Sequence, residues 1–286
     1  MVTPAQRRAV VTETRARRAL PLRRACRYLG IHRSLLQYRS RAAAQTALRQ
    51  RLGELALAKP RWGSPRFTWR LQREGWAVNH KRIERLVREE RLLVGQRPRR
   101  KRVAVSRVPT PMPTRPDQRW SMDFVRDTTA EGRPFRVWTL VDDATRECPL
   151  LLVDRSLPAW RVVEALDMLL VLRRRPLTIV CDNGPEFVSQ ALDHWASRQG
   201  IHLDFIRPGH PVENCFIESF NGKLRDECLS QYHFATLAEA RDRIEQWRQE
   251  YNTERPHSSL GNSTPAEYAA RFTPEEGYSS TLILRS

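Results

Sequence analysis

Two short stretches decide the fold: RWSMDFVRD at residues 119–127 and LTIVCDNGPEF at residues 177–187. Each contains a run apolar enough for a buried strand, and each carries an aspartate that packing does not explain. Asp123 lies in the middle of the first stretch, where alternation puts it on the face opposite Trp120 and Met122. Asp182 ends the strand of the second stretch and precedes an Asn-Gly-Pro turn, which exposes it. A desolvated carboxylate in a strand costs several kcal/mol unless something neutralises it.

The sequence around these stretches predicts an α/β fold, a mixed sheet with helices on its faces. Further strands are expected at residues 135–143, 148–153 and 202–206. Helices are expected at residues 160–172, 186–198, 213–229 and 237–251.

Residues 1–45 predict an all-α helix-turn-helix module that binds DNA. Helices are expected at 5–18, 22–29 and 32–41, with a tight turn at Gly30 and a small residue, Cys26, four positions before it. The third helix would then offer Arg33 and Gln37 to a major groove. An ordinary three-helix bundle with solvated arginines fits the same spacing.

Residues 46–95 predict a second helix-turn-helix-like module. Pro65 to Glu74 is expected to be helical, and Asn79 is a good N-cap for the next helix, which carries Lys81 and Arg82 as expected DNA contacts. Residues 96–118 follow as a basic, proline-rich linker whose DNA-contacting residues would be Arg99, Arg100, Lys101 and Arg102. The catalytic core is then expected at 119–235, with a C-terminal helix and tail at 236–286 packing on it.

The charge of the chain is divided between its two parts. The 286 residues include 50 Lys and Arg against 32 Asp and Glu; residues 1–118 hold 30 against 7, a net of +23, and the remainder is −5. This asymmetry predicts a polyanion-binding region joined to a part with another task, and DNA is the obvious polyanion. The sequence shows no membrane-spanning run, no secretion signal and no paired cysteine spacing, so we expect a soluble intracellular protein.

A third carboxylate, Glu218, lies on a predicted helix 35 residues beyond Asp182. On a helical wheel Asn221 and Arg225 share its side, while Phe220 and Leu224 lie on the other side. The helix can therefore bury its aromatic side on the sheet and present Glu218 to a cleft.

No Lys or Arg lies within two positions of Asp123 or six of Asp182, and three carboxylates fit hard divalent cations better than a salt bridge. We expect Asp123, Asp182 and Glu218 to bind two Mg²⁺ or Mn²⁺ ions, which could activate a water or a 3′-hydroxyl and stabilise the leaving oxygen. The alternative is that these residues are N-caps and surface acids. Asp142 and Asp143 are expected to support the end of the sheet, and Glu186 is expected in the first turn of a helix.

Three motifs carry a family resemblance: WSMDF at 120–124, CDNGPEF at 181–187 and RPGHPVENCFIESFNGKLRDECL at 207–229. They resemble the integrase core of insertion-sequence transposases, most closely the second-frame product (OrfB) of the two-reading-frame family, number three in the insertion-sequence classification, within the retroviral integrase-like superfamily. The segments EGWAVNHKRIERLVREE at 74–90 and YNTERPHSSLGNSTPAEY at 251–268 are also similar to it. The stretch at 56–69 matches less closely, and the zinc-binding domain of the retroviral relatives has no counterpart.

The resemblance implies an RNase H-like core and a catalytic triad of Asp123, Asp182 and Glu218, with a basic residue, Arg225, seven positions beyond the glutamate. It implies a DDE transposase, a polynucleotidyl transferase that cleaves the 3′ ends of an element and then transfers the strands. The expected DNA contacts near the scissile bond are His210, Asn221, Lys223 and Arg225. The expected partners are the terminal inverted repeats, the target DNA, further copies of the chain on the DNA ends, and a first-frame (OrfA) protein or fusion. The resemblance also implies a bacterial cytoplasmic protein that associates with the nucleoid.

Two other functions fit parts of the sequence. A metal-dependent nuclease with the same triad would hydrolyse DNA without joining it, and a non-enzymatic regulator would use only the basic N-terminal modules. Tyrosine or serine recombination is disfavoured, because neither chemistry needs clustered carboxylates.

Overall fold

The computed structural model describes residues 4–37, 45–92, 112–184, 187–207 and 214–272. The chain forms two units, residues 1–51 and residues 52–286. None of the helices in the described ranges has both the length and the apolar composition to cross a lipid bilayer.

The first unit is built from α1 (Pro4–Arg18), α2 (Leu22–Tyr28), α3 (Ser34–Gln37) and the beginning of α4 (Thr46–Ala58). Its small core contains Val11, Ala25 and Cys26, so the small residue expected at the close approach of the helices is buried. Gly30 has φ +63°, and the backbone N–H of Ile31 bonds the carbonyl of Cys26. The predicted helix–turn–helix at Gly30 is confirmed; of the predicted third helix, the part beyond Gln37 lies outside the described residues.

The second helical module, residues 52–92, begins the other unit. It comprises the end of α4, α5 (Ser64–Arg73) and α6 (His80–Glu89), packed around Leu52, Phe67, Leu71 and Leu86. Asn79 caps α6 as predicted, because its side-chain oxygen accepts from the Arg82 backbone N–H at 2.8 Å. The sequence reading did not include α4.

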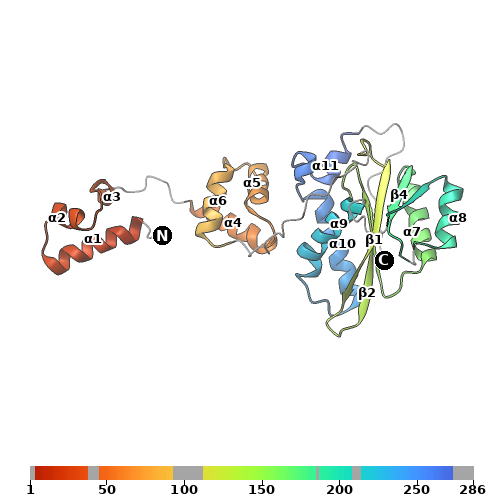
Figure 1. The fold of residues 1–286 in the computed structure, drawn as a ribbon, viewed down its shortest axis with the longest axis horizontal. Coiled ribbons are helices and arrows are strands. Elements are labelled where there is room, and N and C mark those ends of the chain that lie inside the picture. Colours follow the sequence, from red (N-terminus) through yellow and green to blue (C-terminus); the bar gives the residue numbers. More distant parts are fainter. Residues whose placement is uncertain (1–3, 38–44, 93–111, 185–186, 208–213, 273–286) are drawn as a thin grey trace. The chain divides into compact units, whose positions relative to one another are not determined.

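The core is a five-stranded mixed sheet in the order β3-β2-β1-β4-β5 (Figure 1). β1 (Arg119–Thr128), β2 (Pro134–Asp142) and β3 (Leu150–Asp154) pair antiparallel, while β4 (Thr178–Cys181) and β5 (His202–Phe205) continue the sheet in parallel from β1. The predicted mixed α/β sheet is confirmed. The third strand begins two residues later than predicted, because the Cys148 N–H bonds the Asn252 side chain and Pro149 has no N–H to give a ladder.

Helices cover both faces of the sheet (Figure 1). α7 (Ala159–Leu172) and α8 (Gln190–Gln199) bury Leu166 and Trp195 against Trp120 and Met122. On the other face lie α9 (Cys215–Leu224), its π-helical continuation η2 (Arg225–Leu229) and α10 (Leu237–Thr253). The alternation predicted for β1 is therefore observed, with Val125 in the second cluster.

Two predicted helices differ from the structure at their ends. The helix expected from 186 begins at Gln190, because Ser189 caps it through a bond from the Leu192 N–H at 3.3 Å. The helix expected over 213–229 is α-helical only to Leu224, and the π-helical turn then adds a residue to its last turn.

The tail after α10 packs on the core, as the sequence predicts. It forms the short turn η3 (Ser258–Leu260) and α11 (Pro265–Ala269), which begins with a capping box of Thr264 and Glu267. The His257 ring is 5% exposed and lies edge-on to Tyr251, with the ring centroids 4.9 Å apart.

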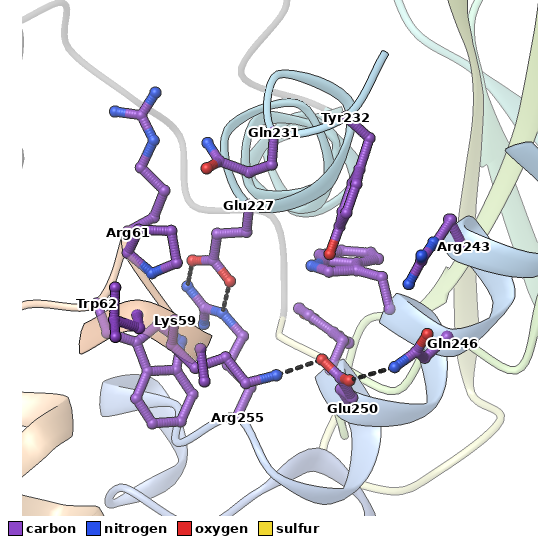
Figure 2. A pocket seen from close by; sticks show the side chains of 15 residues that line it. Lys59, Arg61, Trp62, Glu227, Gln231, Tyr232, Arg243, Gln246, Glu250 and Arg255 are labelled. Carbon is purple, nitrogen blue, oxygen red and sulfur yellow. Dashed lines mark hydrogen bonds and ion pairs between the residues drawn. The ribbon is translucent and has the colours of Figure 1, made fainter. Parts of the chain in front are cut away.

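Ion pairs join the second helical module to the core. Arg66 of α5 forms an ion pair with Glu227 of η2 at 2.9 Å, and Arg255 donates two hydrogen bonds of 2.7 and 2.8 Å to the same carboxylate. Lys59 pairs with Glu250 beside a pocket of about 260 Å³ that lies between the two parts (Figure 2). Glu227 is thus a buried junction between the module and the helix that carries Glu218.

We predict that Glu227→Gln lowers the free energy of unfolding by about 3 kcal/mol, since it leaves two guanidiniums without their carboxylate. Burial alone would raise the pKa of Glu227, but the Arg255 bonds and the charges of Arg255 and Arg66 lower it below its usual value. The stabilisation is therefore complete at neutral pH and is lost only as pH falls through that lowered pKa. Urea unfolding followed by tryptophan fluorescence measures the change.

The matched control is Glu84→Gln, which removes an exposed pair with Arg88 on α6. Such pairs contribute about 0–1 kcal/mol. Equal effects of the two substitutions would contradict the role given to Glu227.

Candidate active site

Asp123 and Asp182 come together through the parallel pairing of β1 with β4. The register aligns Trp120 with Ile179 and Ser121 with Val180. Continuing it by two residues aligns Asp123 with Asp182, the residue that directly follows β4. Neighbouring strands lie roughly 4.8 Å apart and paired residues point to the same face, so the two carboxylates are neighbours.

Glu218 reaches the same face on α9, which packs across β1 and β2. Its helix is fixed there by Ile217, Phe220 and Leu224, all at most 1% exposed. Asn221, one turn beyond Glu218, donates from its Nδ2 to the Asp123 Oδ2 at 2.8 Å. That bond joins the helix of the third carboxylate to the strand of the first.

The environment of Asp123 disfavours its charge. Burial, followed by the negative charges of Asp182 and Glu218, raises the pKa of Asp123 to about 6, against bonds from the Phe124 N–H at 2.6 Å and from Asn221. Both acids therefore lie close enough to Asp123 to act on it electrostatically, as the strand register and the packing of α9 require.

The donor set fits a divalent cation. Three carboxylates supply hard oxygen ligands, and within the described residues none of the three takes part in an ion pair. Asn221 Oδ1 is buried beside Asp123 without a hydrogen-bond partner, so the space has a further unsatisfied oxygen. In the described part of the chain no three His, Cys, Asp or Glu side chains are close enough to hold one ion in common. The site therefore presents suitable ligand types on one face of the sheet, at separations larger than those of a single shared ion.

The neighbouring acids have structural partners. Asp142 is fully buried and accepts from the backbone N–H groups of Asp117, Ala144 and Thr145. Asp143 forms an ion pair with Arg119 at 2.6 Å and accepts from Ser121. These bonds confirm the prediction that both aspartates support the end of the sheet, whereas Glu186 lies outside the described residues.

The three expected DNA contacts that follow Glu218 in the sequence lie in different surroundings. Arg225 is exposed and begins η2, seven residues beyond Glu218. Asn221 is 6% exposed and contacts Asp123 instead of solvent. Lys223 lies about 140° around the helix from Glu218, at 100° per residue. Its Nζ bonds Ser219 at 2.9 Å, so it does not share the space of the triad.

The remaining expected DNA contacts belong to the helical modules and the linker. Arg33 and Lys81 are exposed, and Arg82 is partly buried in the first turn of α6. The side chain of Gln37, as well as Arg99, Arg100, Lys101, Arg102 and His210, lies outside the described residues.

The link between Asn221 and Asp123 is the part of the site that sequence reasoning missed. The available signal was the spacing of three residues from Glu218, which placed Asn221 correctly on the same side of the helix. Nothing in the sequence distinguishes an asparagine that contacts DNA from one that holds a carboxylate.

Comparison with known families assigns the two main parts of the chain. The integrase core domain family matches residues 113–211, a second integrase core domain family matches residues 199–265, and the HTH-like domain family matches residues 44–102. The matched integrase segments together contain Asp123, Asp182 and Glu218.

Related proteins come from bacterial insertion elements. The "Insertion element IS407 uncharacterized 31.7 kDa protein" of Burkholderia multivorans is 44% identical over 250 residues, which cover 87% of this chain and 90% of the relative. This chain belongs to the IS3-family OrfB transposases, with a DDE integrase core. An IS476 protein of Xanthomonas euvesicatoria is 40% identical over 96% of this chain and 80% of its own length. Transposase InsF of insertion sequence IS3A from Escherichia coli K12 is 25% identical over 85% of this chain and 92% of the relative.

The structural comparison agrees on the fold. The chain is similar to one in a cryo-EM structure of the simian T-cell lymphotropic virus intasome in complex with PP2A regulatory subunit B56 gamma, with a TM-score of 0.52, 14% identity, and coverage of 82% of this chain and 80% of that chain. The RNase H-like integrase fold implied by the sequence is confirmed. As a member of this transposase family, the chain acts in DNA transposition, and its integrase and HTH-like domains imply DNA binding.

We predict that Asp123→Asn stabilises the metal-free protein while the wild type gains more from added Mg²⁺. The raised pKa means that ionised Asp123 destabilises the folded state, an effect absent below pH 4 and complete above about 6. In EDTA at pH 7.5 the thermal midpoint of the variant should lie about 2–4 °C above that of the wild type, as expected for a gain of about 1 kcal/mol in the free energy of unfolding. Differential scanning calorimetry measures the shift.

The difference should shrink at pH 5, where the wild-type carboxyl is protonated. Addition of MgCl₂ at pH 7.5 should raise the midpoint of the wild type more than that of the variant. A variant that unfolds at lower temperature in EDTA would contradict the electrostatic account of Asp123.

Proposed function

We propose that this transposase cleaves DNA at the 3′ ends of its insertion element and transfers those ends to target DNA, using Asp123, Asp182 and Glu218 as a DDE triad. The observation that carries the proposal is the register of β1 with β4, which aligns the two aspartates beneath the helix of Glu218. Family membership supports the reaction class, and the fit of the donor set supports the need for divalent cations.

The three carboxylates would hold two Mg²⁺ or Mn²⁺ ions. Bound there, these ions supply Lewis-acid activation of the attacking hydroxyl and stabilisation of the leaving oxygen in phosphoryl transfer. The protein's own residues prepare this site: Asn221 and the Phe124 N–H orient the Asp123 carboxylate, and the apolar side of α9 fixes the helix position of Glu218.

The basic residues would bind and position the DNA. Arg225 lies exposed on the side of Glu218, where it can pair with a phosphate near the scissile bond. Arg33 of the first module and Lys81 of the second are exposed positions for contacts with the element ends. The net charge of +23 on residues 1–118 supports this division of labour.

Assembly on DNA follows from the reaction. Two element ends must be held together for coupled transfer, so we propose a homo-oligomer on the DNA ends. Whether the chain acts alone or needs a first-frame partner is decided by running the joining reaction described below with and without that partner.

The test is an in vitro joining reaction. Purified protein, Mg²⁺, a fragment carrying the element's own terminal repeats and a supercoiled target plasmid should give joined products. Asp123→Asn and Glu218→Gln should each lower joining at least 100-fold, because removing one acidic ligand disrupts the site for phosphoryl transfer. Gel electrophoresis of labelled ends measures cleavage and joining separately.

Asp242→Asn on the exposed surface of α10 is the control and should keep wild-type joining. Cleavage without joined products would favour a nuclease. DNA binding by the wild type without cleavage or joining would favour a non-enzymatic DNA-binding regulator. Joining at the wild-type level in both triad variants would refute the catalytic role of these carboxylates.

A further inference from the structure

A group of four basic side chains, the basic cluster, lies on the side of α9 away from Glu218. Its members come from separate parts of the second unit: Arg66 from α5, Arg146 from the turn after β2, Lys223 from α9 and Arg255 from the segment after α10. Arg66 and Arg255 contact the same carboxylate, that of Glu227, at 2.9 and 2.7 Å. The positive charges of Arg66, Arg146 and Arg255 each lower the pKa of Lys223, so all three lie within electrostatic range of the lysine.

The acids around the basic cluster are too few to neutralise it. Glu227 pairs with Arg66 at 2.9 Å and with Arg255 at 2.7 Å (the latter drawn in Figure 2). Asp143, which faces Arg146, is already paired with Arg119 at 2.6 Å, and Asp226, whose charge acts on Arg66, pairs with Arg61 at 3.5 Å. With Lys223 protonated, the four cations and Glu227 carry a net charge of about +3 in a partly buried space, which favours an additional anion.

Lys223 is the member least satisfied by the protein. Its ammonium group can donate three hydrogen bonds, yet within the described residues only the Ser219 hydroxyl accepts one, at 2.9 Å. Burial and then the charges of Arg255, Arg66 and Arg146 lower the pKa of Lys223 to about 7, with Glu227 opposing them. A purely structural lysine would have a carboxylate at ion-pair distance, whereas within the described residues Lys223 forms no ion pair, and the carboxylate that acts on it, Glu227, is bound by Arg66 and Arg255.

The chemistry of the basic cluster selects a phosphate. Arginine guanidiniums and a lysine ammonium are the protein's usual partners for phosphate oxygens. The side chains of Lys223 and Arg146 are partly buried and that of Arg66 is 29% exposed, so a ligand can reach them from solvent. Arg255 is 5% exposed and held by Glu227, so it contributes charge without needing to move.

We propose that Arg66, Arg146, Lys223 and Arg255 form a binding site for a DNA backbone phosphate, shared between the second helical module and the catalytic core. The inference rests on the proposed function, because it takes the ligand to be the DNA on which the triad acts. It places this contact on the opposite side of α9 from the triad. A strand leaving the HTH-like module would thereby be held by the same helix that carries Glu218.

Phosphate binding at this site should be coupled to protonation of Lys223, which a purely structural lysine would not show. Near pH 8 the unbound lysine is largely neutral, and a phosphate beside it raises its pKa, so binding takes up a proton. DNA affinity of the wild type should then fall by up to about tenfold per pH unit between pH 7.5 and 9, in addition to any pH dependence that the wild type shares with the variants. The other groups that face Lys223 do not titrate there: the pKa of Glu227 is lowered, burial and the neighbouring cations lower the pKa of His257, and the guanidiniums stay protonated.

The experiment measures binding of the full chain to a fluorescein-labelled random-sequence 30-base-pair duplex in EDTA, by anisotropy across salt concentration and pH. Lys223→Met should reduce the slope of log Kd against log salt by about one, the value for one lost phosphate contact. It should also remove the excess pH dependence. Lys223→Arg should keep the wild-type salt slope and lose the pH dependence, since arginine stays charged.

Arg66→Met tests the contribution of the second module and should also lower the salt slope. Arg198→Met, an exposed arginine on α8, is the control and should match the wild type in both readouts. Circular dichroism checks that each variant is folded, and Lys223→Arg keeps the test valid if Lys223→Met does not fold.

Wild-type salt slopes and pH profiles in all Lys223 and Arg66 variants would overturn the proposal. Binding of inorganic phosphate that depends on Lys223, without any change in the DNA slope, would also overturn the assignment to DNA. Because no metal or catalysis is needed, the outcome is independent of the joining assay. Loss of joining in the triad variants, or its absence in the wild type, leaves this measurement intact.

Discussion

The packing of α9 on the β1–β2 face of the sheet is the contact on which the site depends. The two aspartates are neighbours because two parallel strands lie side by side, but Glu218 joins them only through a helix that is far away along the chain. Phe220 and Leu224 hold that helix on the sheet, and Phe220 in turn meets Trp247 and Tyr251 of α10 with ring centroids 5.5 and 4.9 Å apart. A polar site thus rests on an aromatic cluster placed directly behind it.

Ion pairs hold the other side of the same helix. Glu227 binds Arg66 and Arg255, and the second module is thereby fixed to the catalytic core by a partly desolvated ion-pair network. Removing one member of such a network costs more than an exposed pair would, so the module and the helix respond together to a change in either. Recognition of DNA and the chemistry on DNA consequently share one structural element.

Much of the fold could be read from periodicity and termini. Alternation along residues 119–127 assigned Trp120 and Val125 to opposite faces, and Gly30 and Asn79 marked a turn and a helix start that the structure reproduces. Asp123 and Asp182 were found as candidates because they lie in or directly after an apolar strand, where packing offers no reason for a charge, and Glu218 because it lies on the polar side of an amphipathic helix. These signals depend only on residues that are close together in the sequence, so they can be recognised without knowledge of the tertiary structure.

Features that depend on tertiary contacts escaped the sequence reading. The strand after Pro149 starts late because Asn252, a hundred residues away, takes the Cys148 N–H. The basic cluster collects arginines from three distant segments, and in a chain with 50 basic residues none of them stands out. Asn221 shares the side of Glu218, yet only the coordinates show that its amide is committed to Asp123.

The π-helical turn at Arg225–Leu229 makes the length of this helix as important as its composition. A turn of this kind contains one residue beyond the α-helical repeat and advances everything after it by about 100°. A deletion of one residue there would leave a regular helix that still forms, but Cys228 and Leu229, now buried, would rotate a quarter-turn out of the core. A change in residue number here would therefore break the phase between Glu218 and the residues of this last turn, Glu227 among them, while every other side chain in the turn stayed the same.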